Sequence, residues 1–267
     1  MRSSRWWVVL SVALVFALSA LLAHAQQPAA PAPAAAVDPR ADEVLRKMGA
    51  TLQAAKSISF ASHAIVDQAR EDGQRVQYAK NQKVRLGRPD KLAGDVTGDV
   101  EELQFRYDGK EVAIYNARTN SWGAVPAPVT IEEMLDMLAL KYGIVMPLAD
   151  LAFPDPYKVL IQNVQRGEYV GTGYVFDTKC HHLAFRQSFV DWQIWIEDGD
   201  KALPHKVVIT FKDQPAHPQY TAFLSEWDLS AAIDDAAFTL KPPAGATKVD
   251  FAPAPTPAAT QPAAGAR

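Results

Sequence analysis

Over most of its middle and late parts the chain alternates apolar and polar residues. This period of two is typical of strands with one buried face and one wet face. Residues 179–212 show it most clearly and predict three consecutive antiparallel strands joined by tight turns. The apolar positions of the middle strand are Val190, Trp192, Ile194 and Ile196. The stretch therefore predicts a sheet with an apolar face that another element must cover.

Shorter segments with the same alternation predict further strands on both sides of this stretch. Glu71-Asp72-Gly73 and Asp108-Gly109 are turn signals between neighbouring segments, so the strands follow one another as hairpins. Residues 168–176 and 219–227 predict two late strands, and alternation places Phe223 and Trp227 on the same face of the second. About ten or eleven strands are expected, a number at which an open sheet must curl or split. Successive hairpins argue against a parallel α/β sheet.

Helical patterns occur at the start and in the middle of the chain. Apolar residues recur at helical spacing over residues 37–56, where Asp38-Pro39 is a helix start. Thr130 and Glu133 form a capping box that opens a second helix, and Gly143 ends it. Residues 146–153 form another apolar piece, and a short helix is expected over 157–165. The predicted class is α+β, a strongly curved antiparallel sheet whose concave face is covered by helices.

The two ends of the chain differ from the part between them. Arg2 and Arg5 precede a long apolar run that finishes in Ala23-His24-Ala25, which is the pattern of a secretory signal peptide cleaved near Ala25. A retained membrane anchor is the alternative, because the apolar run approaches the roughly 18 residues that a spanning helix needs. Stretches rich in proline and alanine follow this run and close the chain, and such stretches do not bury enough surface to fold. The expected division is a signal peptide at 1–25, a linker at 26–37, one domain at 38–250 and a disordered tail at 251–267.

Charge and cysteine content exclude some partners. The formal net charge is -3 and the charges are dispersed, so no basic footprint for nucleic acid or an anionic membrane is present. The single cysteine, Cys180, has no second cysteine with which to form an internal disulfide. Cys180, His182 and His205 are possible metal ligands, but no second pair with ligand spacing supports them. A buried cysteine and hydrogen-bonded histidines are favoured, and neither a metal nor a cofactor is expected.

Catalytic signatures are also missing from the sequence. It contains no G-x-S-x-G elbow, glycine-rich phosphate loop or H-E-x-x-H helix, and its carboxylates are not spaced as an acid and base pair. No catalytic residues are predicted, and the chain is not expected to be an enzyme. The methionines of the helical insert, Met134, Met137 and Met146, have two interpretations. They form a lid over a lipid-sized cavity, or they are ordinary core.

Several segments carry a resemblance to a known group. They are YDGKEVAIYNARTNSW, TIEEMLDMLALKYGIVMPLADL, YVGTGYVFDTKCHHLAFRQ, DWQIWIEDGDKALPHKVVITFK and FTLKPPAGA. They resemble a family of predicted periplasmic bacterial proteins classed as a domain of unknown function. That family is similar in fold to the LolA, LolB and LppX superfamily of lipoprotein and lipid carriers. The resemblance implies an unclosed β-barrel that holds acyl chains between sheet and helices.

Two functions follow as hypotheses. The first is a periplasmic, non-enzymatic carrier or binder of a lipid or lipoprotein acyl chain, in a cavity between the sheet and the insert of residues 130–153. The second is a periplasmic interaction or regulatory protein of the same fold that binds a protein partner in the cell envelope and has no lipid ligand. Neither nucleic acid nor stable membrane insertion after signal cleavage is expected. The expected cavity residues are Phe60, Met134, Leu135, Met137, Leu138, Tyr142, Met146, Leu151, Phe153, Trp192, Ile194 and Ile196.

Overall fold

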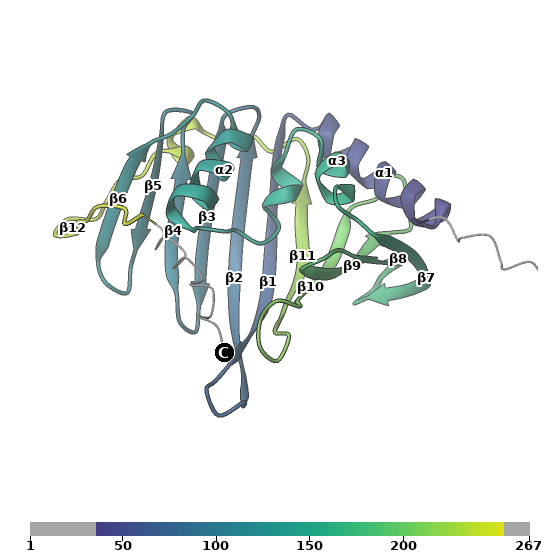
Figure 1. Ribbon diagram of the computed structural model, residues 1–267. Coiled ribbons are helices and arrows are strands. Elements are labelled where there is room, and N and C mark those ends of the chain that lie inside the picture. Colours follow the sequence, from purple (N-terminus) through teal and green to yellow (C-terminus); the bar gives the residue numbers. More distant parts are fainter. Residues whose placement is uncertain (1–35, 254–267) are drawn as a thin grey trace, which may run out of the picture. The chain divides into compact units, whose positions relative to one another are not determined.

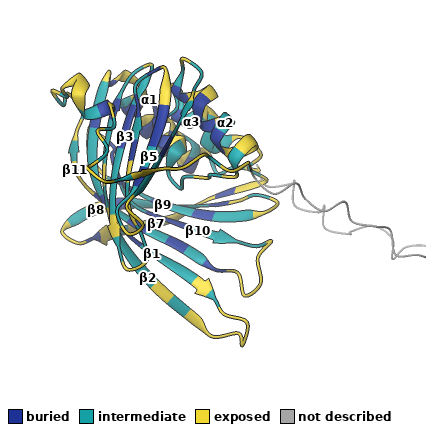
Figure 2. Cartoon of the chain, turned by 90° about the vertical axis from the view of Figure 1, so that its left-hand side faces the viewer, coloured by how far each residue is buried: buried dark blue, intermediate teal, exposed yellow. Residues whose placement is uncertain are grey.

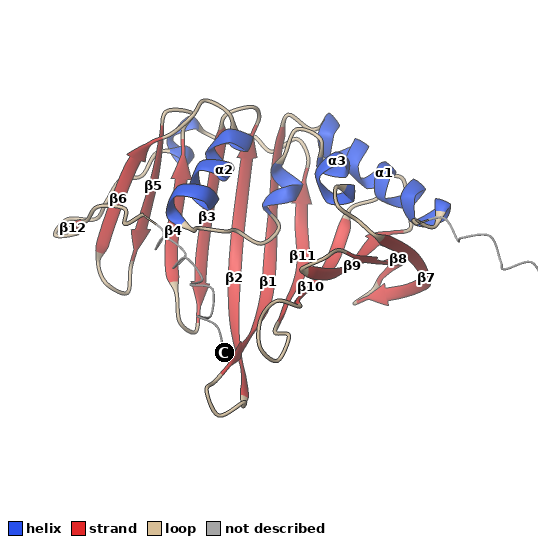
Figure 3. Ribbon diagram, viewed as in Figure 1, coloured by secondary structure: helices blue, strands red, loops and turns tan. Residues whose placement is uncertain are grey.

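The computed structural model describes residues 36–253. The predicted signal peptide (1–25), most of the predicted linker (26–37) and most of the predicted tail (251–267) lie outside the described residues. Within the described part, one sheet of twelve strands carries three α-helices on one of its faces, here called the inner face (Figures 1 and 3). No helix in residues 36–253 is both long enough and apolar enough to span a membrane.

The strands are joined mainly by hairpins, as the turn signals predict. Their bounds are β1 (Ser57–Ala69), β2 (Arg75–Gly87), β3 (Lys91–Gly98), β4 (Glu102–Tyr107), β5 (Glu111–Asn116), β6 (Ser121–Pro126), β7 (Arg166–Val175), β8 (Thr178–Arg186), β9 (Val190–Glu197), β10 (Pro204–Phe211), β11 (Gln219–Asp228) and β12 (Thr247–Lys248). Their order across the sheet is β12-β6-β5-β4-β3-β2-β1-β11-β10-β9-β8-β7. All neighbours are antiparallel except β12 and β6.

The predicted fold class is confirmed. The sheet is antiparallel, curved and unclosed, because β12 and β7 stand at its two ends and do not pair with each other (Figure 2). It has more strands than predicted, and one of them is the two-residue strand β12, which is too short to produce a period of two. The main hydrophobic cluster joins residues of α1, α2 and η1 to residues of the sheet.

The first helix, α1 (Pro39–Ala54), forms where the apolar spacing predicts it. Asp38 caps its start, since the Asp38 side chain accepts a hydrogen bond from the backbone N–H of Arg40 at 2.8 Å. The residues that α1 buries completely follow the helical repeat and lie on one face. They are Ala41, Leu45, Met48 and Leu52. This face contacts β7 and β9, so α1 covers the late half of the sheet.

The second helix, α2 (Ile131–Tyr142), begins and ends at the predicted signals. The Thr130 hydroxyl accepts from the backbone N–H of Glu133 at 3.2 Å. The Glu133 carboxylate accepts from that hydroxyl, whereas in a full capping box it would accept from the Thr130 backbone N–H. Gly143 ends the helix in the left-handed region, at φ 66°. The short helices η1 (Ala149–Ala152), α3 (Pro156–Ile161) and η2 (Asp235–Phe238) complete the fold.

The close packing of α1 on α3 depends on a glycine. A Cβ atom on Gly49 would lie 2.5 Å from the Cβ of Tyr157, which is too close for any side chain. We expect Gly49→Ala to lower the free energy of unfolding by about 1–3 kcal/mol, the usual cost of overpacking, although alanine is the better helix former. Urea denaturation measures this. Gln53→Ala, at an exposed position of the same helix, is the control and is expected to stay within about 0.5 kcal/mol.

Candidate functional site

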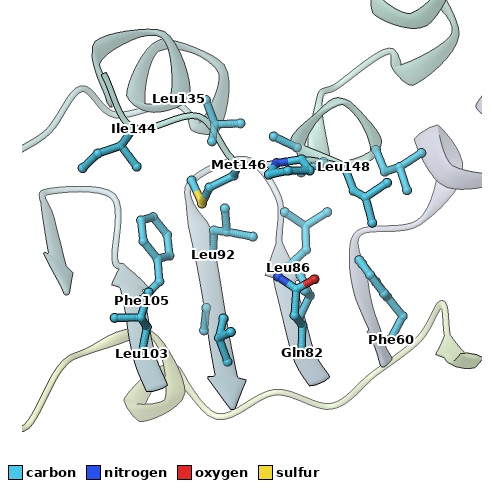
Figure 4. A pocket seen from close by; sticks show the side chains of 18 of the residues that line it. Phe60, Gln82, Leu86, Leu92, Leu103, Phe105, Leu135, Ile144, Met146 and Leu148 are labelled. Atoms are coloured by element: carbon cyan, nitrogen blue, oxygen red, sulfur yellow. The ribbon is translucent and has the colours of Figure 1, made fainter. Parts of the chain in front are cut away.

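A cavity of about 280 Å³ lies between the inner face of strands β1 to β5 and the segment that links α2 to η1 (Figure 4). Leu86, Leu92 and Phe105 form part of its floor, and their side chains point from the sheet toward Met146 and Leu148 of that segment. Most of the other sheet residues around it are also apolar. They are Ile58, Phe60, Val84, Ala93, Gly94, Val96, Leu103, Ile114 and Trp227. The cavity is an apolar space with a covering segment.

Four of the residues expected from the sequence line this cavity: Phe60, Leu135, Met146 and Leu151. The other eight lie elsewhere. Met134 and Leu138 are fully buried core residues of α2, whereas Met137, Tyr142 and Phe153 pack against the core at its edge. Trp192, Ile194 and Ile196 lie in the core of the late half of the sheet, and α1 contacts their strand, β9.

The expected wall residues Trp192, Ile194 and Ile196 are thus not among those that line this cavity. The cavity forms where the segment after α2 covers β2 to β5, at the other half of the sheet. The predicted cavity combined the insert with residues 190–196, whereas this cavity combines the insert with strands β1 to β5. The floor residues on β2 to β4, which the sequence did not predict, alternate with polar residues as those of β9 do. This alternation is the signal that could have identified them.

Trp227 reaches the cavity through an irregularity in β11. The register against β1 shifts between Ser59 and Ala61, and Glu226 has a left-handed φ of 54°, so the side chains of β11 change faces at this point. As a result Trp227 lines the cavity and stacks on Phe60, with ring centroids 4.5 Å apart. Its ring nitrogen donates to the Pro204 carbonyl at 3.0 Å. The prediction that Phe223 and Trp227 share a face is wrong, because strict alternation ignores the bulge.

One end of the cavity is polar. Among the described residues that line it, the polar side chains are Lys80, Gln82 and Glu101. The Lys80 ammonium donates to the Glu101 carboxylate at 2.5 Å, and the two side chains are partly buried, with 17% and 31% of their surface exposed. The Gln82 side-chain oxygen accepts from the hydroxyl of Tyr220 at 3.1 Å, and burial raises the pKa of Tyr220, which keeps that hydroxyl a donor.

The cysteine and the two histidines considered as metal ligands each have a partner of their own. Burial raises the pKa of the Cys180 thiol to about 11, so the thiolate nucleophile is disfavoured. The His182 ring is 2.9 Å from the side-chain oxygen of Gln193, and the His205 ring is 3.1 Å from the Glu197 carboxylate. Within residues 36–253 no group of three or more His, Cys, Asp or Glu side chains is arranged to hold a metal ion.

His182 makes the stability of the fold depend on pH. Its ring stacks on Trp195 with centroids 4.0 Å apart, and burial, together with the Lys206 ammonium, lowers its pKa below 6.5 although the Gln193 hydrogen bond opposes this. The unfolded chain therefore binds a proton at higher pH than the folded chain does. The contribution of His182 to the free energy of unfolding is complete above pH 6.5 and is lost as the pH falls below that value. We expect His182→Phe, which keeps the stacking, to flatten the fall of Tm below pH 6.5. If the variant loses Tm below pH 6.5 as steeply as the wild type does, His182 is not the source of that loss.

The sequence matches a known family over most of the described part. A model of the family described as "Predicted periplasmic protein (DUF2092)" matches residues 41–252. The chain belongs to this family. The match runs from α1 past β12, so it includes every strand of the sheet. No curated protein matches the chain.

Several solved structures are similar to this member of the DUF2092 family at low sequence identity. Lipoprotein LppX of Mycobacterium tuberculosis has 12% identity and a TM-score of 0.47, over 74% of this chain and 100% of that one. LprF of Mycobacterium bovis has 11% identity and a TM-score of 0.42, over 75% and 98%. A LolA superfamily protein of Nitrosomonas europaea has 10% identity and a TM-score of 0.37, over 75% and 97%.

Proposed function

We propose that this protein is a periplasmic, non-enzymatic binding protein that holds an acyl chain or a similar amphiphile. The supporting observation is the cavity of about 280 Å³ with apolar walls and one polar end. Its size is near the lower bound of about 300–1,000 Å³ for small-molecule sites. An acyl chain fits this chemistry, because each methylene that leaves water contributes about 0.8 kcal/mol to binding.

The segment Gly143–Leu148 is the proposed route of entry. Both of its end residues have left-handed backbone conformations, with φ 66° at Gly143 and 69° at Leu148. Such a conformation is unfavourable for leucine and marks a place where the chain turns sharply. Between these turns Val145 is 75% exposed, while Met146 faces the cavity. Movement about the two turns would admit and release a ligand without unfolding α2.

The proposal includes the processing inferred from the sequence. In it, residues 1–25 direct secretion and are cleaved near Ala25. A single domain at 38–250 then acts in the periplasm, preceded by the linker at 26–37 and followed by the tail at 251–267. The description of the family as periplasmic supports the location.

A titration tests the proposed function. The mature protein is titrated with N-phenyl-naphthylamine, an uncharged apolar dye that fluoresces in apolar surroundings, and we expect saturable binding. Met146→Asp should raise the Kd of the dye at least tenfold, because it places a charge against the apolar cavity. Leu140→Asp, on the same cover but 84% exposed, is the matched control and should bind as the wild type does. No saturable binding by the folded wild type would reject the proposal.

A protein-binding role is the second candidate, and the surface of β7 favours it. This strand stands at the end of the sheet. Gly167 at its start pairs with Ala36 and Asp38, and beyond that point no other strand of the described residues pairs with its outer edge. Val170 and Tyr174 on β7, and Phe176 just beyond it, are 50%, 71% and 79% exposed. If the dye does not bind, crosslinking through a photoreactive residue at position 174 in intact cells is the next test. A single recurrent crosslinked protein would support this role.

A further inference from the structure

The polar end of the cavity is a prebuilt site, held by the backbone around it. Lys80 and Gln82 lie two residues apart on β2, so both side chains point to the inner face. Glu101 comes from the turn between β3 and β4, which is fastened to β2 beside Lys80. The Asp99 side chain accepts from the backbone N–H of Ala79 at 2.7 Å, and the Asp99 N–H donates to the Ala79 carbonyl at 3.0 Å.

A glycine allows this close approach. A Cβ atom on Gly98 would lie 2.7 Å from both the Ala79 carbonyl oxygen and the Cβ of Lys80. Any larger residue at position 98 would push the turn, and Glu101 with it, away from β2. The ion pair between Lys80 and Glu101 is therefore set by the backbone and is not a chance meeting of two flexible surface side chains.

The ion pair also separates two spaces. A second cavity of about 250 Å³ shares Lys80 and Glu101 with the apolar one, and its other lining residues include Val66, Asp67 and Tyr78. The apolar cavity suits a tail, and the second cavity has room for a head group beside the pair. Beside that head the charged groups are one ammonium, from Lys80, and one carboxylate, from Glu101. Asp67 also lines the second cavity, but its carboxylate is held by the Gln77 side chain, the Gln219 backbone N–H and Arg75.

From this arrangement we propose that the ligand is an amphiphile whose head group has no net negative charge, either uncharged or zwitterionic. This inference rests on the proposed function. An anionic head beside the pair would compete with Glu101 for the Lys80 ammonium and repel the Glu101 carboxylate at close range, which is unfavourable where both side chains are partly buried. A neutral head leaves the pair intact.

Gln82 supplies a donor for such a head. Its side-chain oxygen is occupied by the Tyr220 hydroxyl, which orients the amide so that its NH₂ group is the remaining polar function. Among the described residues no hydrogen bond from this NH₂ group is found, and the side chain lines the cavity. A carbonyl oxygen of an ester or amide at the head is the matching acceptor.

Probes with the same tail and different heads test the inference. Dodecanoylglycerol is uncharged, dodecanoyl lysophosphatidylcholine is zwitterionic, and dodecanoate is anionic at mildly alkaline pH. Each displaces N-phenyl-naphthylamine from the wild-type protein, below the concentration at which the probe forms micelles. We expect at least one of the two neutral probes to bind at least tenfold more tightly than dodecanoate. Whichever of the two neutral probes has the lower Kd shows whether the site prefers an uncharged or a zwitterionic head.

Two variants assign the preference to the ion pair. Glu101→Gln frees the Lys80 ammonium, so dodecanoate should gain at least tenfold in affinity relative to dodecanoylglycerol. The double variant Lys80→Met with Glu101→Gln has no charge to offer and should regain a preference for the neutral heads. Dye binding by each variant checks that the cavity is intact.

The inference and the proposed function fail in different ways. If the dye binds but dodecanoate binds the wild type as tightly as both neutral probes do, the head-group inference is overturned and the proposed function stands. An unchanged probe ratio in Glu101→Gln also overturns the inference. If neither the dye nor any probe binds the folded wild type, the proposed function fails and the inference fails with it.

Discussion

Gly94→Phe is expected to abolish ligand binding and to leave the protein folded. Gly94 lies on the inner face of β3, between Val84 and Phe105 on the neighbouring strands, and lines the cavity. A Cβ atom there would meet a single neighbour within 4 Å, the Cβ of Phe105 at an ordinary 3.9 Å. A phenylalanine side chain therefore has room to grow into the cavity, where it would occupy the space proposed for the ligand.

The expected result is a rise of at least tenfold in the Kd of N-phenyl-naphthylamine. The free energy of unfolding should stay equal or increase by up to about 1 kcal/mol, because glycine is a poor strand residue and aromatic residues are good ones. Gly173→Phe is the matched control, since a Cβ on this β7 glycine meets nothing within 4 Å and the site is away from the cavity. A folded Gly94→Phe protein that binds the dye like the wild type would place the ligand elsewhere.

Trp227→Ala is expected to destabilise the fold by about 3 kcal/mol, at the lower end of the cost for a large aromatic residue because Trp227 is only partly buried. The change removes the stacking on Phe60 and the hydrogen bond to the Pro204 carbonyl, which together fix the end of β11 against its neighbours. It also removes one wall of the cavity, so dye binding should weaken. Urea denaturation and the dye titration measure the two effects.

Trp227→Phe separates the two contributions of this side chain. It keeps a ring for Phe60 and loses the donor to Pro204, so a loss of about 1 kcal/mol is expected. If the alanine variant loses no more than the phenylalanine variant, the stacked ring contributes little and this account of the end of β11 is wrong.

Local signals predicted the elements of the fold well. Asp38 begins α1, Thr130 begins α2 and Gly143 ends it, because each of these residues satisfies or releases backbone groups at a helix end whatever the rest of the chain does. The hairpin turn at Gly73 has the left-handed backbone, at φ 84°, that a glycine there indicates. The antiparallel sheet followed from the alternation and from the turns between strands.

The location of the candidate site did not follow from such signals. An apolar face at residues 190–196 and an apolar insert at 130–153 each need a partner, but the period of two does not say which cover meets which strand. In the fold α1 contacts β9, the strand of residues 190–196, whereas the insert lies against β2 to β5. The change of faces at Trp227 depends on a single bulge, and the ion pair of Lys80 with Glu101 depends on the turn between β3 and β4. Neither feature is visible in the hydrophobic pattern of the sequence.

The most direct test of the central claim is the lipid content of the protein itself. The mature protein is purified from the periplasm without detergent and extracted with organic solvent, and the extract is analysed by mass spectrometry beside that of Gly94→Phe. We predict an amphiphile in near-stoichiometric amount in the wild type and its loss from the variant. No amphiphile in the wild type, or equal amounts in both proteins, would contradict the claim that the cavity between the sheet and residues 143–152 is a ligand site.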